Sequence, residues 1–231
     1  MTERGGSQRI PRPPGARVGG PPPWARLSVA ARDPSLEQVR DALSTTGPPK
    51  AHPIEHTGVR ASAVLAPLYV EAGAVHIVFT RRAQHLRTHR GEVSFPGGGQ
   101  EKGDADLVAT ALREAKEETG LDPSLVEVIG ELDHLTTITS RSFIVPFVGV
   151  LSGRPELDPN PAEVEKILHV PIGQLLDPDV FRQERWGLPG LNRPVYFFEI
   201  PGDTIWGATA AMLVNFLSVV TGTADRAVPG I

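Results

Sequence analysis

The sequence contains no cysteine among its 231 residues. This absence excludes disulfide bonds, cysteine nucleophiles, zinc sites with thiolate ligands and iron–sulfur clusters. Side-chain metal ligands are then restricted to His, Asp and Glu, and the carboxylates among them favour hard divalent cations. Carboxylate-rich segments are therefore the candidates for metal-dependent chemistry in this sequence.

An excess of basic residues is also missing, because 23 Lys and Arg stand against 27 Asp and Glu, with a formal net charge of −4. This balance does not draw the whole protein to nucleic acid or to anionic lipid, so any basic site must be local. Long apolar runs are missing as well. Residues 208–220 are too short to span a bilayer and are interrupted by Asn215 and Ser218, so we interpret them as a core helix. We expect no nucleic-acid or membrane partner and a cytoplasmic location.

Proline and glycine, by contrast, are concentrated at the N-terminus, where residues 1–24 contain six Pro and five Gly. Such a segment has almost nothing to bury and cannot recover its ordering entropy, so we predict a flexible tail over residues 1–32. Its Arg residues also suit a transit peptide, but the prolines disfavour an amphipathic helix and Glu3 has the wrong charge. A single domain over residues 33–222 and a C-terminal tail over 223–231 complete the predicted organisation.

The rest of the chain alternates between strand and helix patterns. Asp33-Pro34-Ser35 predicts a helix with Asp33 as cap and Pro34 at its first position, ending before Gly47. Apolar runs predict strands at residues 61–70, 75–80, 126–132, 143–151 and 195–200, the first two around a turn. Several strands with few helices between them predict an α/β or α+β sandwich built on a mixed sheet.

The sharpest local pattern is a helix over residues 107–119, which Asp104 or Asp106 can cap and Gly120 can end. At about 100° per residue, its apolar positions form one stripe. Three glutamates fall within an arc of roughly 100° beside this stripe. The helix therefore has a buried face and an acidic face that adjoin.

The three glutamates are Glu114, Glu117 and Glu118, and Glu118 lies at the apolar edge. Carboxylates at these spacings repel one another unless a cation lies among them or their protons are retained. A Mg²⁺ or Mn²⁺ ion resolves the conflict, and Arg113, four residues before Glu117, can hold that carboxylate in place. Taken alone, such a charge run is more often a solvated helix face.

The segment before this helix favours a metal site over a solvated helix face. Phe95-Pro-Gly-Gly-Gly supplies glycines that allow a tight turn and a close approach of the backbone to a ligand, and it leads into the same helix. A glycine turn, a short loop, a carboxylate helix and a terminal glycine form one unit. This unit can bring a diphosphate and its metal ions together.

Arg113-Glu-Ala-Lys-Glu-Glu-Thr-Gly-Leu121 resembles the second half of the signature of Nudix hydrolases. The signature also has an early Glu, and here the sequence departs from it. Counted from Gly99, the position falls on Ala105. Counted from Gly98 with one extra loop residue, it falls on Asp104, a shorter carboxylate that can serve there.

A second segment is similar to the element that precedes the signature in coenzyme A pyrophosphatases. It consists of Val78-Phe-Thr-Arg-Arg-Ala, then Arg87, Gly91 and Phe95-Pro-Gly-Gly, with departures at Phe79 and Ala83. Further segments resemble this subfamily in type and order, and the resemblance covers about residues 33–220: Thr139-Ser140, Asn160-Pro-Ala-Glu-Val and Ile205-Trp-Gly-Ala-Thr.

The resemblance implies a Nudix-type α/β/α sandwich with a mixed β-sheet and a glycine loop, carboxylate helix and loop motif. It also implies metal-dependent hydrolysis of the diphosphate of coenzyme A or its derivatives, with Mg²⁺ or Mn²⁺ as cofactor. The products are adenosine 3′,5′-bisphosphate and 4′-phosphopantetheine or its acyl form. Residues in three roles follow: metal ligands Glu114, Glu117 and Glu118; catalytic residues Glu117, Glu118 and Glu163; substrate-binding residues Arg81, Arg87, Gly91, Phe95, Gly97 and Gly98.

Several of these assignments have alternatives. Glu163 or Glu165 can serve as general base, with Glu163 favoured by its place in the matching segment, but a surface role is an equal alternative for each. Arg82 and Arg90 belong to the same basic cluster as the substrate-binding arginines and can face phosphate oxygens, with a surface role as a realistic alternative. His134 and His169 are interpreted as structural, and Trp206 as a core residue or a residue lining the substrate cleft.

Two other functions compete with coenzyme A hydrolysis. One is hydrolysis of another nucleoside diphosphate derivative, such as NADH or ADP-ribose. The other is a catalytically silent ligand sensor on the same fold, which Ala105 favours and the intact glutamate trio opposes. The sequence leaves the oligomeric state open and is compatible with a homodimer.

Overall fold

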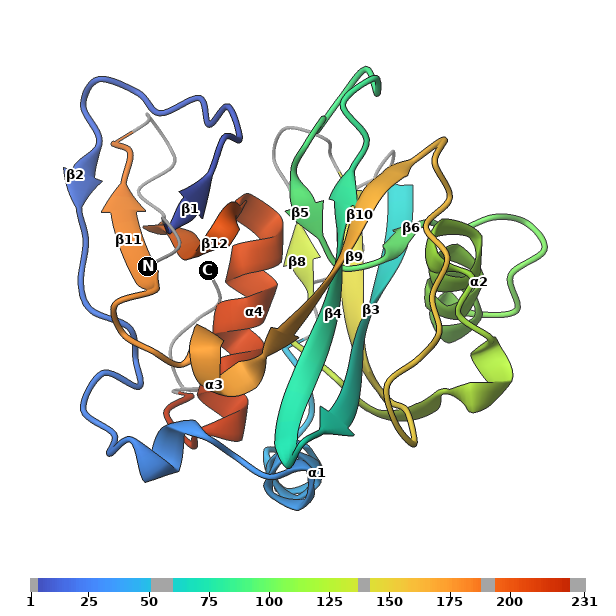
Figure 1. Ribbon diagram of the computed structural model, residues 1–231, viewed down its shortest axis with the longest axis horizontal. Coiled ribbons are helices and arrows are strands. Elements are labelled where there is room, and N and C mark those ends of the chain that lie inside the picture. Colours follow the sequence, from blue (N-terminus) through green and yellow to red (C-terminus); the bar gives the residue numbers. More distant parts are fainter. Residues whose placement is uncertain (1–3, 51–59, 137–141, 188–193, 225–231) are drawn as a thin grey trace.

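The computed structural model describes residues 4–50, 60–136, 142–187 and 194–224. Its centre is an eight-stranded sheet with helices on both faces, and a four-stranded sheet lies beside it (Figure 1). The Thr139-Ser140 segment and residues 225–231 of the predicted C-terminal tail lie outside the described residues. Within the described part, no helix is long and apolar enough to cross a membrane.

The eight-stranded sheet is mixed, as predicted. β3 (Arg60–Glu71) and β9 (Ser142–Val150) are parallel, and the other pairs are antiparallel. The main path also contains β10 (Val164–Pro171), β4 (Ala74–Arg82) and β7 (Glu127–Glu131), in the order β10-β4-β3-β9-β7. Three short strands extend it: β5 (Val93–Ser94), β6 (Gly97–Gly99) and β8 (Leu135–Thr136).

The two faces of this sheet are covered by different helices. On β3, Val64, Ala66 and Leu68 belong to the core under α4 (Gly207–Val220), whereas Ala63 and Leu65 belong to the core under α2 (Leu107–Thr119). Successive strand residues point to opposite faces, so a strand buried on both sides is apolar almost throughout. The predicted helices over residues 107–119 and 208–220 are confirmed.

The first long helix begins later than predicted. α1 (Leu36–Thr45) has Ser35 as its N-cap, and Ser35 and Gln38 exchange hydrogen bonds in a capping box. This reciprocal pair satisfies two backbone groups at once, so it takes precedence over Asp33 followed by Pro34. The prediction of Asp33 as the cap is therefore wrong by two residues.

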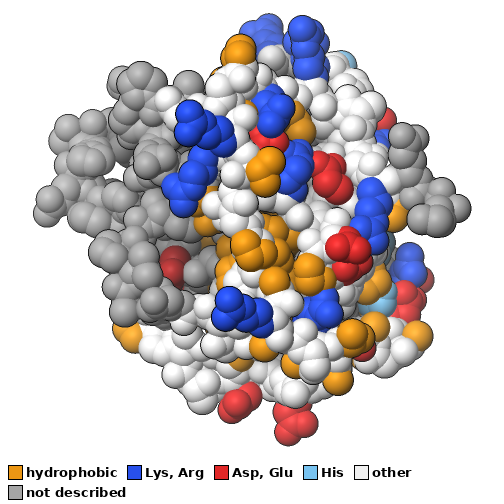
Figure 2. All heavy atoms as spheres, turned by 90° about the vertical axis from the view of Figure 1, so that its left-hand side faces the viewer, with side chains coloured by type: hydrophobic (Ala, Val, Ile, Leu, Met, Phe, Trp, Pro, Cys, Tyr) orange, Lys and Arg blue, Asp and Glu red, His pale blue; other side chains and the backbone are white. Residues whose placement is uncertain are grey.

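The predicted strand at residues 195–200 lies in a separate sheet. β12 (Pro194–Trp206) pairs with β11 (Phe181–Arg185) and with the two-residue β1 (Gly5–Gly6), and β11 also pairs with β2 (Arg17–Val18). Figure 2 shows this side of the molecule, where Lys and Arg side chains surround a group of hydrophobic ones. The remaining short helices are η1 (Ala30–Arg32), η2 (Pro123–Leu125) and α3 (Ile172–Leu175).

The N-terminal residues contribute to this second sheet. Residues 4–20, which we term the N-terminal arm, supply β1 and β2. Trp24 follows the arm and is fully buried against Phe181 and Phe198. The expectation that this stretch has almost nothing to bury is therefore wrong, while the domain limits at residues 33 and 222 stay predictions.

Candidate active site

The carboxylate helix α2 is held at both ends by its own sequence. The Asp106 side chain accepts a hydrogen bond from the backbone N–H of Ala109 at 2.7 Å, and Gly120 ends the helix with a φ of 70°. Asp106 is thus the cap among the two candidates, and Asp104 is available for another role. Ala111 and Ala115 are fully buried against the sheet, which fixes the direction of the acidic face.

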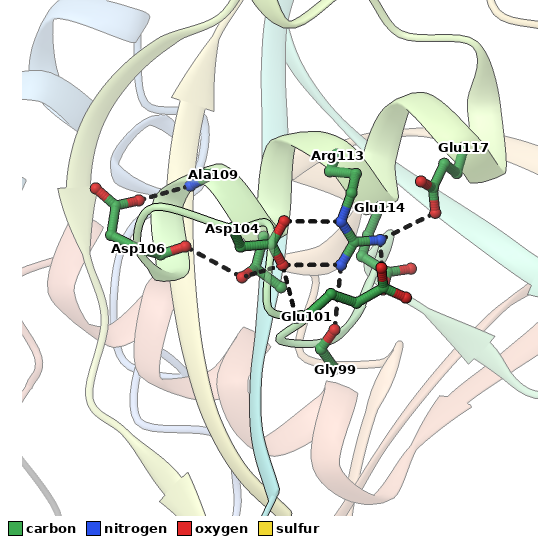
Figure 3. Close-up of polar contacts among 9 residues, drawn as sticks. Gly99, Glu101, Asp104, Asp106, Ala109, Arg113, Glu114 and Glu117 are labelled. Atoms are coloured by element: carbon green, nitrogen blue, oxygen red, sulfur yellow. Dashed lines mark hydrogen bonds and ion pairs between the residues drawn. The ribbon is translucent and has the colours of Figure 1, made fainter.

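Asp104 forms a two-pronged ion pair with Arg113 (Figure 3). The Asp104 carboxylate also accepts hydrogen bonds from the Glu101 backbone N–H and the Thr110 hydroxyl, both at 2.9 Å. The Arg113 guanidinium, followed by the Glu101 N–H, lowers the pKa of Asp104 well below its usual range. Asp104 is thus the partner of Arg113, and its service in place of the early Glu of the signature stays a prediction.

Arg113 also reaches the acidic face of α2. Its Nη1 donates to Glu117 Oε2 at 3.0 Å and lies 3.1 Å from Glu114 Oε1, while Nη2 donates to the Gly99 carbonyl at 3.1 Å. The predicted contact between Arg113 and Glu117 is confirmed. One guanidinium thus joins the glycine turn, the loop before α2 and two glutamates of the helix, as Figure 3 shows.

The glycine turn lies against these glutamates. A Cβ at Gly98 would be 2.5 Å from the Glu114 carboxylate, and a Cβ at Gly97, where φ is 155°, would be 2.4 Å from the Ala63 carbonyl oxygen. Residues with side chains would displace either the carboxylate or the neighbouring strand. The close approach of backbone that the sequence indicated is present at this turn.

Glu118 is the most unusual group of the site, because its side chain is only 3% exposed. Burial, with smaller contributions from Glu114 and Glu163, raises the pKa of Glu118 to about 8, although Arg82 and the Gly97 backbone oppose the shift. Its Oε2 has no hydrogen-bond partner among the described residues. A buried carboxyl oxygen without a partner is costly unless a proton or a cation satisfies it.

The glutamate trio suits a hard divalent cation in ligand type but is not assembled around one. No group of three or more His, Asp or Glu side chains in the described part has the spacing of a metal site. Arg113 engages Glu114 and Glu117, and Arg82 approaches Glu118, so arginines provide positive charge at the trio. The unpartnered Glu118 oxygen and the adjacent carboxylates fit a cation that would replace these contacts.

The structure brings Glu163 to the site and directs Glu165 elsewhere. The Glu163 carboxylate contributes to the raised pKa of both Glu114 and Glu118, which indicates its proximity. Its loop is fixed to the end of α2 by the backbone N–H of Asn160, which donates to the Glu118 carbonyl at 2.9 Å. Glu165 instead pairs with Arg81 at 3.2 Å.

The two adjacent arginines of β4 lie on opposite sides of the sheet. Arg82 lies on the same face of β4 as Val78, which is the face covered by α2. Its Nη1 is 4.0 Å from Glu118 Oε1. Arg81 points toward β12, where it pairs with Asp203 at 3.1 Å. The sequence left a surface role open for Arg82, although counting alternate residues from Val78 would have placed it beside the glutamates.

The other predicted substrate-binding residues are divided between a loop and the core. Arg87 and Arg90 are exposed in the loop after β4, and Gly91, with a φ of 69°, closes that loop on the Arg82 carbonyl. Phe95 is 2% exposed and stacks on Phe79. A substrate contact by the Phe95 side chain stays a prediction that this placement does not favour.

The histidines and the last tryptophan have local partners. The Tyr69 hydroxyl lies 2.8 Å from His169 Nδ1, and Glu131 pairs with His134. Trp206 stands at the N-cap position of α4, partly buried, with its ring centroid 6.2 Å from that of Trp186. These contacts agree with the structural interpretation of both histidines.

A NUDIX domain model matches residues 59–188, more than half of the chain. The chain belongs to the Nudix family. It is 38% identical over 175 residues to Nudix hydrolase 22, chloroplastic, of Arabidopsis thaliana, a match that covers 73% of this chain and 57% of the plant protein. NudL, a Nudix hydrolase of Photorhabdus laumondii, is 36% identical over 154 residues, covering 67% of this chain and 81% of NudL. The chain thus spans less than two thirds of the plant relative.

Among solved structures, the Nudix hydrolase RenU of M. smegmatis is similar with a TM-score of 0.48 and 17% identity. That likeness covers 76% of this chain and 91% of RenU. The predicted Nudix fold, with helices on both faces of a mixed sheet, is confirmed by the architecture and by the matching family model.

Proposed function

We propose that this Nudix protein hydrolyses the diphosphate bond of coenzyme A or a derivative with Mg²⁺ or Mn²⁺. The observation that carries the proposal is Glu118, a buried carboxyl near Glu114 and Gly97, whose pKa is raised to about 8 and whose Oε2 has no hydrogen-bond partner among the described residues. Strongly perturbed carboxyls of this kind are typical of catalytic and metal-binding sites.

The reaction breaks one P–O bond of the anhydride and adds water across it. When bound, a divalent ion would supply positive charge to the diphosphate oxygens and would make the attacking water more acidic. Glu114, Glu117 and Glu118 would hold the ion, and Arg113 orients the Glu117 carboxylate through its 3.0 Å contact. Glu163 is the proposed acceptor of the proton of the attacking water, because its carboxylate lies close enough to Glu114 and Glu118 to raise the pKa of both.

Recognition of a phosphate-rich substrate is supported by the basic residues around the site. Arg82 faces the glutamates, while Arg87 and Arg90 are exposed in the following loop. Arg forms two-pronged contacts with phosphate, and coenzyme A carries a 3′-phosphate in addition to its diphosphate. The coenzyme A choice itself rests on the resemblance of residues 78–98 to coenzyme A pyrophosphatases.

Incubation of the purified full chain with coenzyme A and Mg²⁺ or Mn²⁺, with products resolved by mass, tests the proposal. We expect adenosine 3′,5′-bisphosphate and 4′-phosphopantetheine from the wild type and almost none from Glu117→Gln. Glu101→Gln is the matched control, because Glu101 is an exposed carboxylate of the preceding loop. Unchanged turnover in Glu117→Gln would contradict the catalytic assignment.

Substrate choice is tested with dephospho-coenzyme A, NADH and ADP-ribose in the same assay. Coenzyme A should be turned over faster than dephospho-coenzyme A, because the loop between β4 and β5 (residues 83–92), which we term the basic loop, would contact the 3′-phosphate. Equal or higher rates on NADH or ADP-ribose would show that the substrate is another nucleoside diphosphate derivative and not coenzyme A. Absence of cleavage of all four compounds would favour a silent ligand sensor.

A further inference from the structure

Asp203 of β12 forms a buried polar centre on the side of the sheet opposite α2. Its side chain is fully buried, and its Oδ1 accepts hydrogen bonds from Arg81 Nη1 at 3.1 Å and from Gln8 Nε2 at 2.9 Å. Its Oδ2 has no hydrogen-bond partner among the described residues, and Lys166 Nζ is 3.9 Å away. A buried carboxylate depends strongly on its few donors, and one of them comes from the N-terminal arm.

Gln8 bridges two groups of β12. While its Nε2 donates to Asp203, its Oε1 accepts a hydrogen bond from the Thr204 backbone N–H at 3.1 Å. Gly6 makes this possible, because a Cβ there would be 1.9 Å from Gln8 Oε1 and 2.8 Å from Asp203 Cα. The glycines of β1 thus let the arm lie directly along β12, as the dark blue strand in Figure 1 shows.

Arg81 connects this centre to the candidate active site. The next residue, Arg82, approaches Glu118, and its backbone closes the basic loop by accepting from the Gly91 N–H and donating to the Glu92 carbonyl. One residue further, the Ala83 N–H donates to the Glu163 carbonyl at 2.8 Å. The end of β4 therefore anchors the basic loop and the loop of Glu163, and Arg81 fixes that end to Asp203.

We propose that Gln8 is a positioning residue for the active site and that the N-terminal arm is an integral part of the catalytic domain. Gln8 holds Asp203, Asp203 holds Arg81, and Arg81 sets the end of β4 from which the basic loop and Glu163 are anchored. The consequence for catalysis rests on the proposed function, because it concerns binding of the same phosphate-rich substrate. The structural consequence, which is the anchoring of the end of β4 through Arg81, does not rest on the proposed function.

Two substitutions in the full chain separate the contacts of Gln8. Gln8→Ala removes both hydrogen bonds, whereas Gln8→Glu keeps an acceptor for Thr204 and replaces the donor to Asp203 by a repelling carboxylate. Ser7→Ala is the matched control, since Ser7 is exposed on the same arm. We expect both Gln8 variants to raise the KM for coenzyme A about tenfold, with a smaller fall in kcat because the loop of Glu163 shares the same anchor, and Ser7→Ala to match the wild type.

Hydrogen exchange provides a readout that does not require turnover. The amides of residues 82–92 should exchange about tenfold faster in both Gln8 variants, while amides of β3 keep wild-type rates and show that the effect is local. Absence of wild-type turnover would refute the proposed function, and exchange would still decide the role of Gln8. Wild-type exchange over residues 82–92 in Gln8→Ala, or wild-type behaviour of Gln8→Glu, would overturn the inference.

Discussion

Arg113 meets Asp104 with two parallel hydrogen bonds, from Nε to Oδ1 at 2.9 Å and from Nη2 to Oδ2 at 3.0 Å. Paired charges of this geometry are both strong and directional. The pair fixes the guanidinium from the side of the loop, and the remaining Nη1 is left to hold Glu117 and Glu114. The orientation of the acidic face therefore depends on a residue outside the helix.

Loss of this pair should destabilise the protein in a pH-dependent way. The pKa of Asp104 is lowered in the folded state, so its contribution is fully present above the ordinary Asp pKa of about 3.8 and is lost as the pH falls below it. Asp104→Asn should lower the urea midpoint at pH 7 relative to Glu101→Gln, and the difference should vanish in acid. A difference that stays constant down to pH 3 would contradict this role of Asp104.

A side chain in the glycine turn should displace the Glu114 carboxylate. We expect Gly98→Ala to fold but to lower kcat by about 100-fold, because the added Cβ would occupy the space 2.5 Å from the carboxylate. Gly103→Ala is the matched control, since nothing lies within 4 Å of a Cβ at that position. Steady-state kinetics of the two variants, with circular dichroism to check folding, tests this expectation. Equal activity of both would argue against a role for the turn.

Glu118 should make the metal-free protein less stable as the pH rises. Its folded pKa of about 8 exceeds the ordinary Glu value of 4.5, so its contribution is fully present below pH 4.5 and is lost as the pH increases toward 8. In EDTA, the free energy of unfolding of Glu118→Gln should therefore increase relative to that of the wild type as the pH rises between these values. The increase should be on the order of 4 kcal/mol at pH 8. Urea unfolding across this range measures the difference, and a pH-independent difference would contradict the buried, protonated state.

Arg82, at the end of β4, should matter more than Arg87 and Arg90 in the basic loop. Arg82→Met removes the cation 4.0 Å from Glu118 and should reduce kcat/KM for coenzyme A by at least about tenfold. Arg90→Met removes an exposed Arg of the same loop and should have a smaller effect. Initial rates at low substrate concentration distinguish the two, and equal losses would mean that Arg82 acts only through general charge.

Local patterns were sufficient where structure depends on neighbours in the sequence. Strands β3, β4, β7, β9 and part of β12, together with α2, follow from apolar patterns and capping residues, and the buried position of Glu118 follows from its angle on the helix. The contact of Arg113 with Glu117 follows from a spacing of four residues. These features could be predicted because one helix or strand contains all the residues involved.

Features that depend on distant segments were not accessible in the same way. Gln8 and Asp203 are 195 residues apart, and Trp24 is buried by Phe181 and Phe198, so neither partnership leaves a local pattern. The N-terminal arm has a composition typical of a flexible tail, yet its glycines match the close approach to β12. Tertiary contacts therefore decide the structure of this segment against its local preference.

The most direct test of the account is binding of Mn²⁺ to the metal-free protein, measured by electron paramagnetic resonance at pH 8. The wild type and Glu101→Gln should bind the ion with the same affinity, whereas Glu118→Gln should weaken binding at least about tenfold, since a buried ligand is lost. Glu114→Gln should weaken it as well. Equal binding by the wild type and Glu118→Gln would contradict the assignment of the metal site to the acidic face of α2.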